Sequence, residues 1–377
     1  MANTLTALQP TLFSAAREVA NEPFGIVPAI NTMFDDKGVA RGDTVTVPVA
    51  PVRVAADFTP ANVPAAGTDA TAASVGVQIT KSRFVSWNIT GEQIRSLENG
   101  ASSNEWVSQL IKQGMRTLRN EAEVDAGTAI KVGASRAYGT AGTTPFASDL
   151  TTFTNVRKIL EDNGAPVANL SMAIDSAAAL NLRGLGIYQQ AYQAGSDKER
   201  RSGSFDPQFG ITPVLSAGVG LHTKGTGTSY TSSTAGFAVG TTSIPIITGT
   251  GTVLAGDVVS FAGDGNKYVV TTGVAAAGTI VIAEPGLRIA LAASAVAMTI
   301  GNNYTANVVF EKQAVVGVIR PPIMPANPTI NQVAISDQFG MTYLLLDIAQ
   351  YGQRTWELHL AWGFKTVTPM FTAIALG

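Results

Sequence analysis

The stretch "DVVSFAGDGNKYVV", residues 257–270, gathers residue types that bind metal ions in a chain with few charges. Calcium loops place oxygen ligands at alternate positions and close with a distant glutamate. Here only Asp264 and Asn266 alternate, Asp257 lies too far upstream, and no glutamate follows before Glu284. Gly-Asp-Gly-Asn between two valine-rich runs is instead typical of a hairpin turn. We therefore predict a turn, with no metal site and no cofactor.

The chain offers few groups that could move protons near neutral pH. It has no cysteine and two histidines, His222 and His359. His359 alternates with large apolar residues in "TWELHLAWG", which favours a structural histidine on one face of a strand. Neither a G-x-S-x-G elbow nor a G-x-x-x-x-G-K-[ST] phosphate loop occurs. The tripeptide Arg41-Gly42-Asp43 is typical of a turn before a strand. We predict that the protein is not an enzyme, and a hydrolase that uses His359 is kept as a third alternative.

The composition favours a protein that assembles. Only 14% of the 377 residues are charged, against about 25% in typical soluble proteins. A surface so poor in charge exposes neutral and apolar area, and large patches of that kind mark contact surfaces. The formal net charge of −2 gives no basic field for sequence-specific DNA binding. We predict no signal peptide, because the start "MANTLTALQP" has no basic region followed by an apolar core. We also predict no membrane span, because the longest apolar stretch, 289–301, is shorter than about 20 residues.

The first part of the chain is predicted to hold two extensions and a long helix. Residues 1–43, interrupted by prolines, predict an arm that needs a partner surface. The runs "TVTVPV" and "SVGVQITKSRFVSWNIT" predict a long two-stranded hairpin over 44–91, whose tip is too poor in large side chains to be stable alone. Residues 92–145 contain a helix of about 29 residues with apolar positions every three to five residues.

The second part alternates between mixed and β-rich composition. Residues 146–224 predict two shorter helices, the second capped by Asp175. Residues 225–301 contain β runs at spacings of about 8 to 12 residues, which indicates an inserted all-β sandwich or barrel. Residues 302–377 predict a strand and a short helix in "NVVFEKQAVVGVIRPP", followed by further strands. The whole chain is therefore predicted to have an α+β fold. The predicted β runs of the insertion are "TSIPII", "DVVSFA", "KYVVTT", "TIVIAE", "LRIALA" and "VAMTI".

Four segments carry a further indication of the fold: "LAGDVVSFAG", "NVVFEKQAVVGVIRPP", "GMTYLLLDIAQYGQRTWELHL" and "AWGFKTVTPMFTAIAL". In this order they resemble motifs of tailed-bacteriophage major capsid proteins of the podovirus coat type. The second resembles an Asn-x-x-Phe strand leading into an Ala-rich helix that ends in Arg-Pro, and the last is similar to the family's closing motif. Glu311 stands where many relatives carry histidine. The resemblance covers nearly the whole chain.

This resemblance implies the HK-ninety-seven-like fold that tailed-phage and herpesvirus capsids share. It implies a major capsid protein that self-assembles through hexamers and pentamers into an icosahedral shell around a double-stranded DNA phage genome. A scaffolding protein and a portal are implied partners, and packaged DNA makes non-specific contact at most. Assembly is expected in the bacterial host cytoplasm, and the protein then resides in the virion. The implied parts are an N-terminal arm (1–43), an E-loop hairpin (44–91), a P domain with the spine helix (92–145), an A domain (146–224), an inserted β-domain (225–301) and a return to the A and P domains (302–377).

The candidate sites are therefore subunit-contact surfaces. We place them at the E-loop tip, at the base of the E-loop and in a charged loop of the A domain. The alternative function is a β-rich virion tail or surface-adhesion protein, with the inserted domain as its binding module. The candidate residues are Asp57, Phe58, Thr59, Pro60 and Thr68 at the tip, Lys81 and Arg83 at the base, and Lys198, Glu199, Arg200 and Arg201 in the loop.

Overall fold

The computed structural model describes most of the chain and leaves several segments undescribed. The described residues are 22–34, 40–49, 55, 57, 60, 73–99, 103–189, 201–325, 330–337 and 339–377.

Helices and strands are mixed along these residues, so the predicted α+β class is confirmed. The helices are α1 (Ile26–Ala29), α2 (Gly91–Asn99), α3 (Ser103–Gly133), α4 (Thr151–Asp162), α5 (Ser176–Gly184) and α6 (Gly186–Gln189), with 3-10 turns at Lys312–Ala314 and Pro369–Phe371. The strands are β1 (Asn31–Phe34), β2 (Thr44–Val49), β3 (Ala73–Gln78), β4 (Lys81–Thr90), β5 (Arg136–Tyr138), β6 (Leu170–Ile174), β7 (Ile211–Leu215), β8 (Leu221–His222), β9 (Thr231–Ser232), β10 (Ser243–Ile247), β11 (Val258–Phe261), β12 (Lys267–Thr272), β13 (Gly278–Ile282), β14 (Met298–Ile300), β15 (Tyr304–Glu311), β16 (Val315–Arg320), β17 (Ile330–Ser336), β18 (Thr342–Gln350), β19 (Gln353–Thr366) and β20 (Thr372–Leu376).

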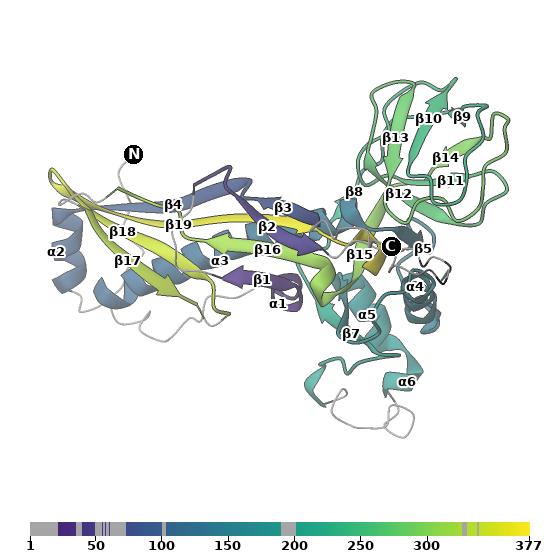
Figure 1. Cartoon of the computed structure of the whole chain (residues 1–377). Helices are drawn as coiled ribbons and strands as arrows, with labels where there is room; N and C mark the ends of the chain where they lie inside the picture. The colour runs from purple at the N-terminus through teal and green to yellow at the C-terminus, as the bar shows by residue number, and fades with distance from the viewer. Residues whose placement is uncertain are drawn as a thin grey trace.

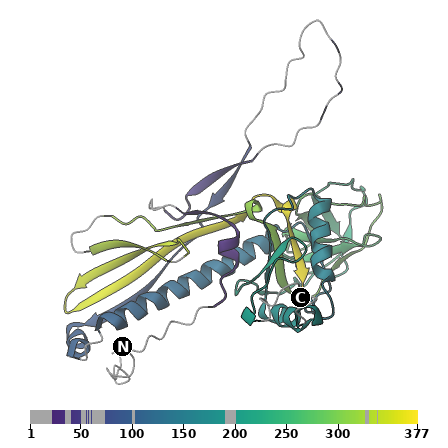
Figure 2. The same ribbon diagram turned by 90° about the horizontal axis from the view of Figure 1, so that it is seen from below.

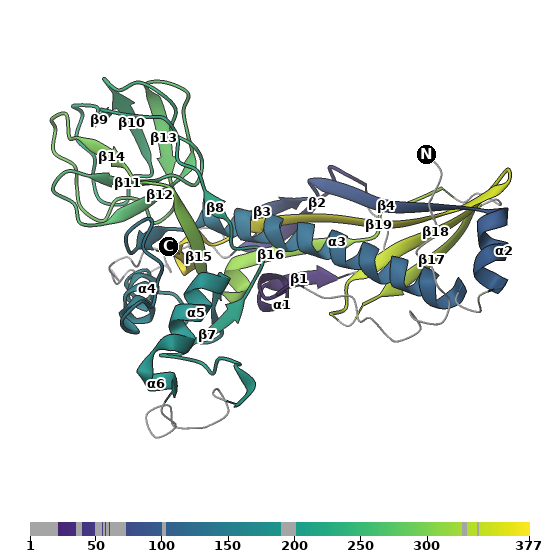
Figure 3. The ribbon, with the colours of Figure 1, turned by 180° about the vertical axis from the view of Figure 1, so that it is seen from behind.

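Helix α3 runs along one face of a long sheet and forms the spine of the molecule (Figures 1 and 3). Within the described residues the sheet has the order β1-β16-β19-β18-β17, and β4 pairs with the other side of β19. Leu358, Leu360 and Trp362 of β19 are fully buried in the core shared with α3. The indole Nε1 of Trp362 donates to Asp125 Oδ2 at 2.7 Å, which fixes the position of the helix along the strand.

The contact face of α3 is an apolar stripe, as predicted. Leu118, Ala122, Ala126 and Ile130 are at most 1% exposed. Burying a leucine or isoleucine side chain stabilises a fold by about 1.5–3 kcal/mol. The stripe also contains glycine where the backbone approaches closely: a Cβ at Gly127 would collide with the carbonyl of Gly218. The predicted long helix is thus confirmed, and its 31 residues include the 29 expected.

Strands β2 and β3 pair antiparallel over their whole length, and this hairpin projects from the body (Figure 2). The prediction of one continuous strand over 74–90 is wrong, because the chain changes partner at Ile79 and Thr80. Ile79 is buried and donates its N–H to Asp43, whereas Thr80 donates to the carbonyl of Trp362. β4 then pairs with β19 in the long sheet. Alternation alone does not show where a strand leaves one sheet for another.

Residues 22–34 of the predicted arm pack within their own subunit. Ile26, Val27 and Ile30 are at most 1% exposed, and β1 pairs in parallel with β16. The prediction of an arm that needs a partner surface is therefore wrong for residues 22–34. Residues 1–21 and 35–39 of the predicted arm lie outside the described residues.

A buried carboxylate holds this segment to the spine. Glu123 of α3 is 0% exposed and accepts hydrogen bonds from the backbone N–H groups of Gly25 at 2.7 Å, Ile26 at 2.6 Å and Val27 at 3.0 Å. The hydroxyl of Ser216 donates to the same carboxylate at 2.5 Å. These donors compensate the cost of burying the charge. Glu123 therefore joins α1, α3 and the segment after β7.

The guanidinium of Arg119 adds a second contact to this segment. It lies 5.0 Å from the ring centroid of Phe24 and 5.2 Å from that of Phe339. The two rings are themselves 4.9 Å apart. A cation between two aromatic rings is attracted by both, so Arg119 links α3 to the chain before α1 and to the turn before β18.

A second sheet joins the rest of the chain to the β-rich insertion. Its order within the described residues is β7-β6-β15-β20-β5-β12-β13-β10-β9, with β11 paired to β12 and β14. Strands β9 to β14 surround their own apolar core, which includes Phe261, Tyr268 and Leu287. Figure 1 shows this part at one end of the elongated molecule, opposite α2. Of the predicted β runs, "LRIALA" forms no strand; Leu291 makes only an isolated bridge with Phe237.

The short helix predicted after Glu311 is also wrong. Lys312–Ala314 form a 3-10 turn, and Val315–Arg320 form strand β16 between β1 and β19. β-branched residues favour a strand. Pairing with β1 on one side and β19 on the other gives hydrogen-bond partners to the backbone N–H and C=O groups of this segment. The strands expected at "INQVAIS", "MTYLLLDIAQY" and "TWELHLAWG" are confirmed as β17, β18 and β19.

Replacing Glu123 with glutamine tests the link between α1 and the spine. In glutamine an amide nitrogen, which donates and cannot accept, replaces one of the two carboxylate oxygens, and the negative charge that the buried donors face is lost. We therefore expect Glu123→Gln to lower the free energy of unfolding by about 2–4 kcal/mol. Urea unfolding of the isolated subunit measures this loss. Glu121→Gln, two positions earlier and in a half-exposed ion pair, is the matched control and should cost about 1 kcal/mol or less. Equal losses in the two variants would contradict the role of Glu123.

Candidate functional site

The acidic glycine step forms the turn between β11 and β12, as predicted from the sequence. Asp264 Oδ1 accepts from the backbone N–H of Asn266 at 2.8 Å and from its side-chain amide at 2.7 Å. The hydroxyl of Tyr268 donates to Asp264 Oδ2 at 2.6 Å. Gly263 has φ +86°, a conformation that glycine adopts at no steric cost. Both carboxylate oxygens thus bind donors of the same hairpin. No cluster of three or more metal-ligating side chains occurs in the part of the chain that the structure describes.

The same turn docks the β-rich insertion onto the end of the spine. Arg136, 5% exposed and three residues beyond α3, donates to Asn266 Oδ1 at 3.1 Å. Its other terminal nitrogen donates to the carbonyl of Ile159 and to Asn163 Oδ1, both at 3.2 Å. A planar guanidinium with several donors can join elements in this way. Arg136 therefore connects the insertion, the end of α3 and helix α4.

Backbone pairing strengthens this junction. Tyr268 pairs with Arg136 and Lys267 with Ala137, so that β12 continues the sheet from β5. Burial raises the pKa of the Tyr268 hydroxyl above its ordinary value, and its hydrogen bond to Asp264 adds to the shift. The hydroxyl therefore stays protonated and donates to Asp264, while it accepts from the N–H of Arg288 at 2.9 Å. The insertion is joined to the body by a sheet, not only by its two chain connections.

A buried pair that sequence reasoning missed forms a second link at this junction. His222 Nε2 lies 2.9 Å from Asp257 Oδ1, and the two side chains are 6% and 0% exposed. Asp257 also accepts from the backbone N–H groups of Gly225 and Leu254. The sequence contained both residues, but they are 35 positions apart and no spacing rule relates them. Since neither side chain is accessible, the pair stabilises the junction and offers no site for a substrate.

The surroundings of this pair are tightly packed. The Tyr304 ring lies 5.1 Å from the His222 ring, and its hydroxyl donates to the carbonyl of Gly256 at 2.6 Å. Burial raises the pKa of Tyr304, which keeps this donor protonated. Gly256 has φ +92°, and a Cβ there would lie 3.0 Å from His222 Cε1. Glycine at this position therefore allows the insertion to approach the imidazole.

His359 and the tripeptide at residues 41–43 have structural contacts. His359 lies on β19 as predicted, 3.0 Å from Glu357 Oε2, with its ring stacked on Phe84. Arg41 donates to the carbonyl of Thr80 at 3.1 Å, and Asp43 accepts from the N–H of Ala40 at 2.8 Å. The tripeptide thus forms the predicted turn before β2.

The predicted contact residues at the base of the hairpin bind the spine. Lys81 Nζ lies 2.9 Å from Asp125 and 3.6 Å from Glu121. Arg83 Nε lies 2.9 Å from Glu121. These partly exposed pairs contribute about 1 kcal/mol or less each. They orient β4 on α3, a role that the sequence did not indicate.

Few of the other predicted contact residues are described. Asp57, Pro60 and Arg201 are exposed to solvent. The remaining predicted contact residues lie outside the described residues: Phe58, Thr59, Thr68, Lys198, Glu199 and Arg200.

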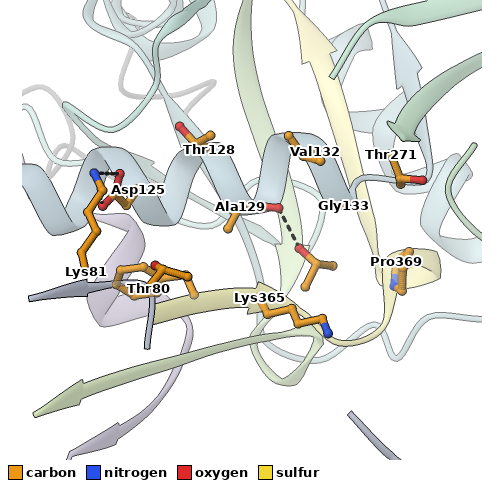
Figure 4. A pocket seen from close by; sticks show the side chains of 12 residues that line it. Thr80, Lys81, Asp125, Thr128, Ala129, Val132, Gly133, Thr271, Lys365 and Pro369 are labelled. Carbon is orange, nitrogen blue, oxygen red and sulfur yellow. Dashed lines mark hydrogen bonds and ion pairs between the residues drawn. The ribbon is translucent and has the colours of Figure 1, made fainter. Parts of the chain in front are cut away.

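A pocket of about 420 Å³ lies beside the hairpin base. Figure 4 shows it between the last turns of α3, strand β19 and Thr271 of β12. The hydroxyl of Thr366 donates to the carbonyl of Ala129 across its floor at 3.1 Å. Lys81 borders one side, and Lys365 donates to the carbonyl of Gly76 in β3. The hairpin, the spine and the insertion therefore meet around one concave surface.

Comparison with known proteins finds relatives by structure alone. No protein-family model matches the chain, and no curated protein matches it. A solved chain described as "Capsid structure of the Cyanophage P-SCSP1u" has a TM-score of 0.52 and 12% identity, over 100% of this chain and 95% of that chain. The chain has the fold of a phage capsid protein. A chain described as "Mycobacterium phage Che8" has a TM-score of 0.52 and 12% identity, over 99% of this chain and 98% of that chain.

The match over nearly the full length confirms the predicted capsid fold. It does not distinguish the podovirus coat type from other capsid types. The likeness extends over nearly the full length of both chains and is not confined to one part of the fold. No helix of the described residues is both long and apolar enough to cross a membrane.

Replacing both Asp264 and Asn266 with alanine tests whether the turn docks the insertion or binds a metal. We expect faster amide hydrogen exchange in β5 and β12, because Arg136 and Tyr268 lose partners. Metal content measured by plasma mass spectrometry should be the same in the variant and the parent. Stoichiometric calcium that disappears in the variant would contradict this interpretation.

The two histidines provide a comparison within one chain. His222→Leu leaves the buried Asp257 with one donor fewer, so we expect a loss of about 2–3 kcal/mol in the free energy of unfolding. His359→Leu should cost less, because Glu357 is 24% exposed and water can replace the imidazole. Thermal and urea unfolding of both variants measure the difference. A larger loss for His359→Leu would contradict the assignment of His222 to the junction.

Proposed function

We propose that this chain is a major capsid protein that self-assembles in many copies into an icosahedral shell around a double-stranded DNA phage genome. The observation that carries the proposal is the match to the cyanophage capsid chain over 100% of this chain and 95% of that chain. A likeness confined to one part would fit a shared module, whereas this match extends over nearly the full length of both chains.

The shape of the subunit supports the proposal. The hairpin of β2 and β3 projects from the body (Figure 2), and a two-stranded hairpin alone is at best marginally stable in water. The chain is also poor in charge, with 14% charged residues. Both features fit a subunit that buries its projections on neighbours, since closed assemblies gain stability from area between subunits.

The proposed contact surfaces are those expected from the sequence, with a sharper role for one of them. The tip of the hairpin, around Asp57 and Pro60, would lie on a neighbouring copy. Lys81 and Arg83, which bind Glu121 and Asp125 of the same chain, would set the angle at which the hairpin reaches that neighbour. Arg201 and the residues before it would contact another copy in the same capsomer.

The remaining parts of the proposal concern partners and location. Copies of this chain in hexamers and pentamers are the main partners, with a scaffolding protein and a portal during assembly. Packaged DNA would meet the wall through non-specific contacts at most, because the net charge of −2 provides no strong attraction for phosphates. Assembly would take place in the host cytoplasm and the mature protein would reside in the virion. The chain would have no enzymatic activity.

Deleting residues 57–69 tests the role of the hairpin. We expect the variant to lose shell formation and to remain a soluble, folded subunit, because the deletion spares the cores around α3 and the insertion. Electron microscopy measures shell formation, and circular dichroism with thermal unfolding checks the fold. A chain in which the same segment is replaced by a flexible linker of equal length separates loss of contacts from shortening. Intact shells from the deletion variant would contradict the proposed contact.

A further inference from the structure

Strand β17 forms one border of the long sheet (Figures 1 and 3). It pairs antiparallel with β18 over seven consecutive residues, from Ile330 opposite Ile348 to Ser336 opposite Thr342. Among the residues that the structure describes, no strand pairs with its other side. The backbone N–H and C=O groups on that side are therefore oriented to bind a further strand.

This border lacks the features that protect the edges of soluble sheets. Edge strands are commonly blocked by charged side chains, proline or a bulge. The sequence of β17, "INQVAIS", contains no charge, proline or glycine, and its register with β18 has no irregularity. The opposite border, β4, carries Lys81 and Arg83. Central Val333 of β17 is 44% exposed. A neutral segment of this composition is one that readily pairs with a copy of itself.

We propose that β17 pairs antiparallel with β17 of a second copy of this chain across a two-fold axis. The inference rests on the proposed function, because a shell supplies copies in the required proximity. A two-fold contact brings the same surface together twice, and a strand without charge meets its copy without repulsion. The register places Val333 opposite the partner's Val333 and Asn331 opposite the partner's Ile335. The two long sheets then form one continuous sheet across the contact.

The absence of cysteine from the chain allows a direct test by disulfide trapping. Residues directly opposite in an antiparallel pair have Cα atoms about 4.5–5.5 Å apart, within the range for a disulfide. Val333→Cys should therefore give covalent dimers after mild oxidation of assembled protein, as seen on a non-reducing gel. Ser86→Cys on β4, the exposed opposite border, is the matched control and should give at least tenfold less dimer.

The register gives a second, more specific expectation. Asn331→Cys and Ile335→Cys should each cross-link weakly alone, because four residues separate each position from its own copy, about 13 Å along the strand. Mixing the two variants before assembly should restore cross-linking. Adding Ala334→Lys to Val333→Cys should weaken the dimer, because in this register the two lysines lie diagonally across the axis, two positions apart, and repel each other, whereas adding Ser86→Lys should not.

The outcomes separate this inference from the proposed function. Shells that cross-link neither at Val333 nor in the mixed pair overturn the β17 contact and leave the capsid assignment intact. A chain that cross-links at Val333 but forms no shells supports the strand pairing and contradicts the proposed function. A chain that forms no shells and no cross-links overturns both.

Discussion

The close packing of α3 on strand β19 is the contact on which the rest of the subunit depends. It requires glycine on the helix where the strand approaches closely: a Cβ at Gly133 would collide with Thr366 of β19, and one at Gly114 would lie against Leu358 of β19 and Trp87 of β4. The remaining parts of the subunit are attached to the same helix or to the residues just beyond it. Glu123 holds the segment around α1, Asp125 and Glu121 bind the hairpin base, and Arg136 just beyond the helix docks the insertion. A helix of 31 residues can carry all of these links because its length separates them.

Patterns within one element were predictable from the sequence. The apolar stripe of α3, the strand type of β19, the Asp175 cap of α5 and the turn at Asp264 all depend on neighbours along the chain. The family resemblance supplied the order of the parts, which periodicity does not contain. Since these signals are local, they were sufficient for element types and for the class of fold.

Contacts between distant segments were not predictable. The break at Ile79 depends on Asp43 and Trp362, and the strand that replaced the helix expected after Glu311 depends on pairing with β1 and β19. Likewise, His222 and Asp257 are ordinary residues in the sequence and become a buried pair only when the insertion folds back on the body. Each of these errors arose where tertiary pairing decided between local alternatives.

The arrangement assigns different mechanical roles to the two ends of the subunit. The insertion is fixed by a continuous sheet and two buried polar links, so it moves with the end of the spine. The hairpin is held at its base by partly exposed ion pairs of Lys81 and Arg83 and by a small core in which Val77 and Ile79 are fully buried.

Electron microscopy of the full chain, expressed with a scaffolding protein, tests the central claim most directly. The capsid assignment predicts closed shells of uniform diameter whose wall density contains the spine helix and the projecting insertion. Folded protein that remains dispersed, or that forms only tubes or fibres without closed shells, would contradict it.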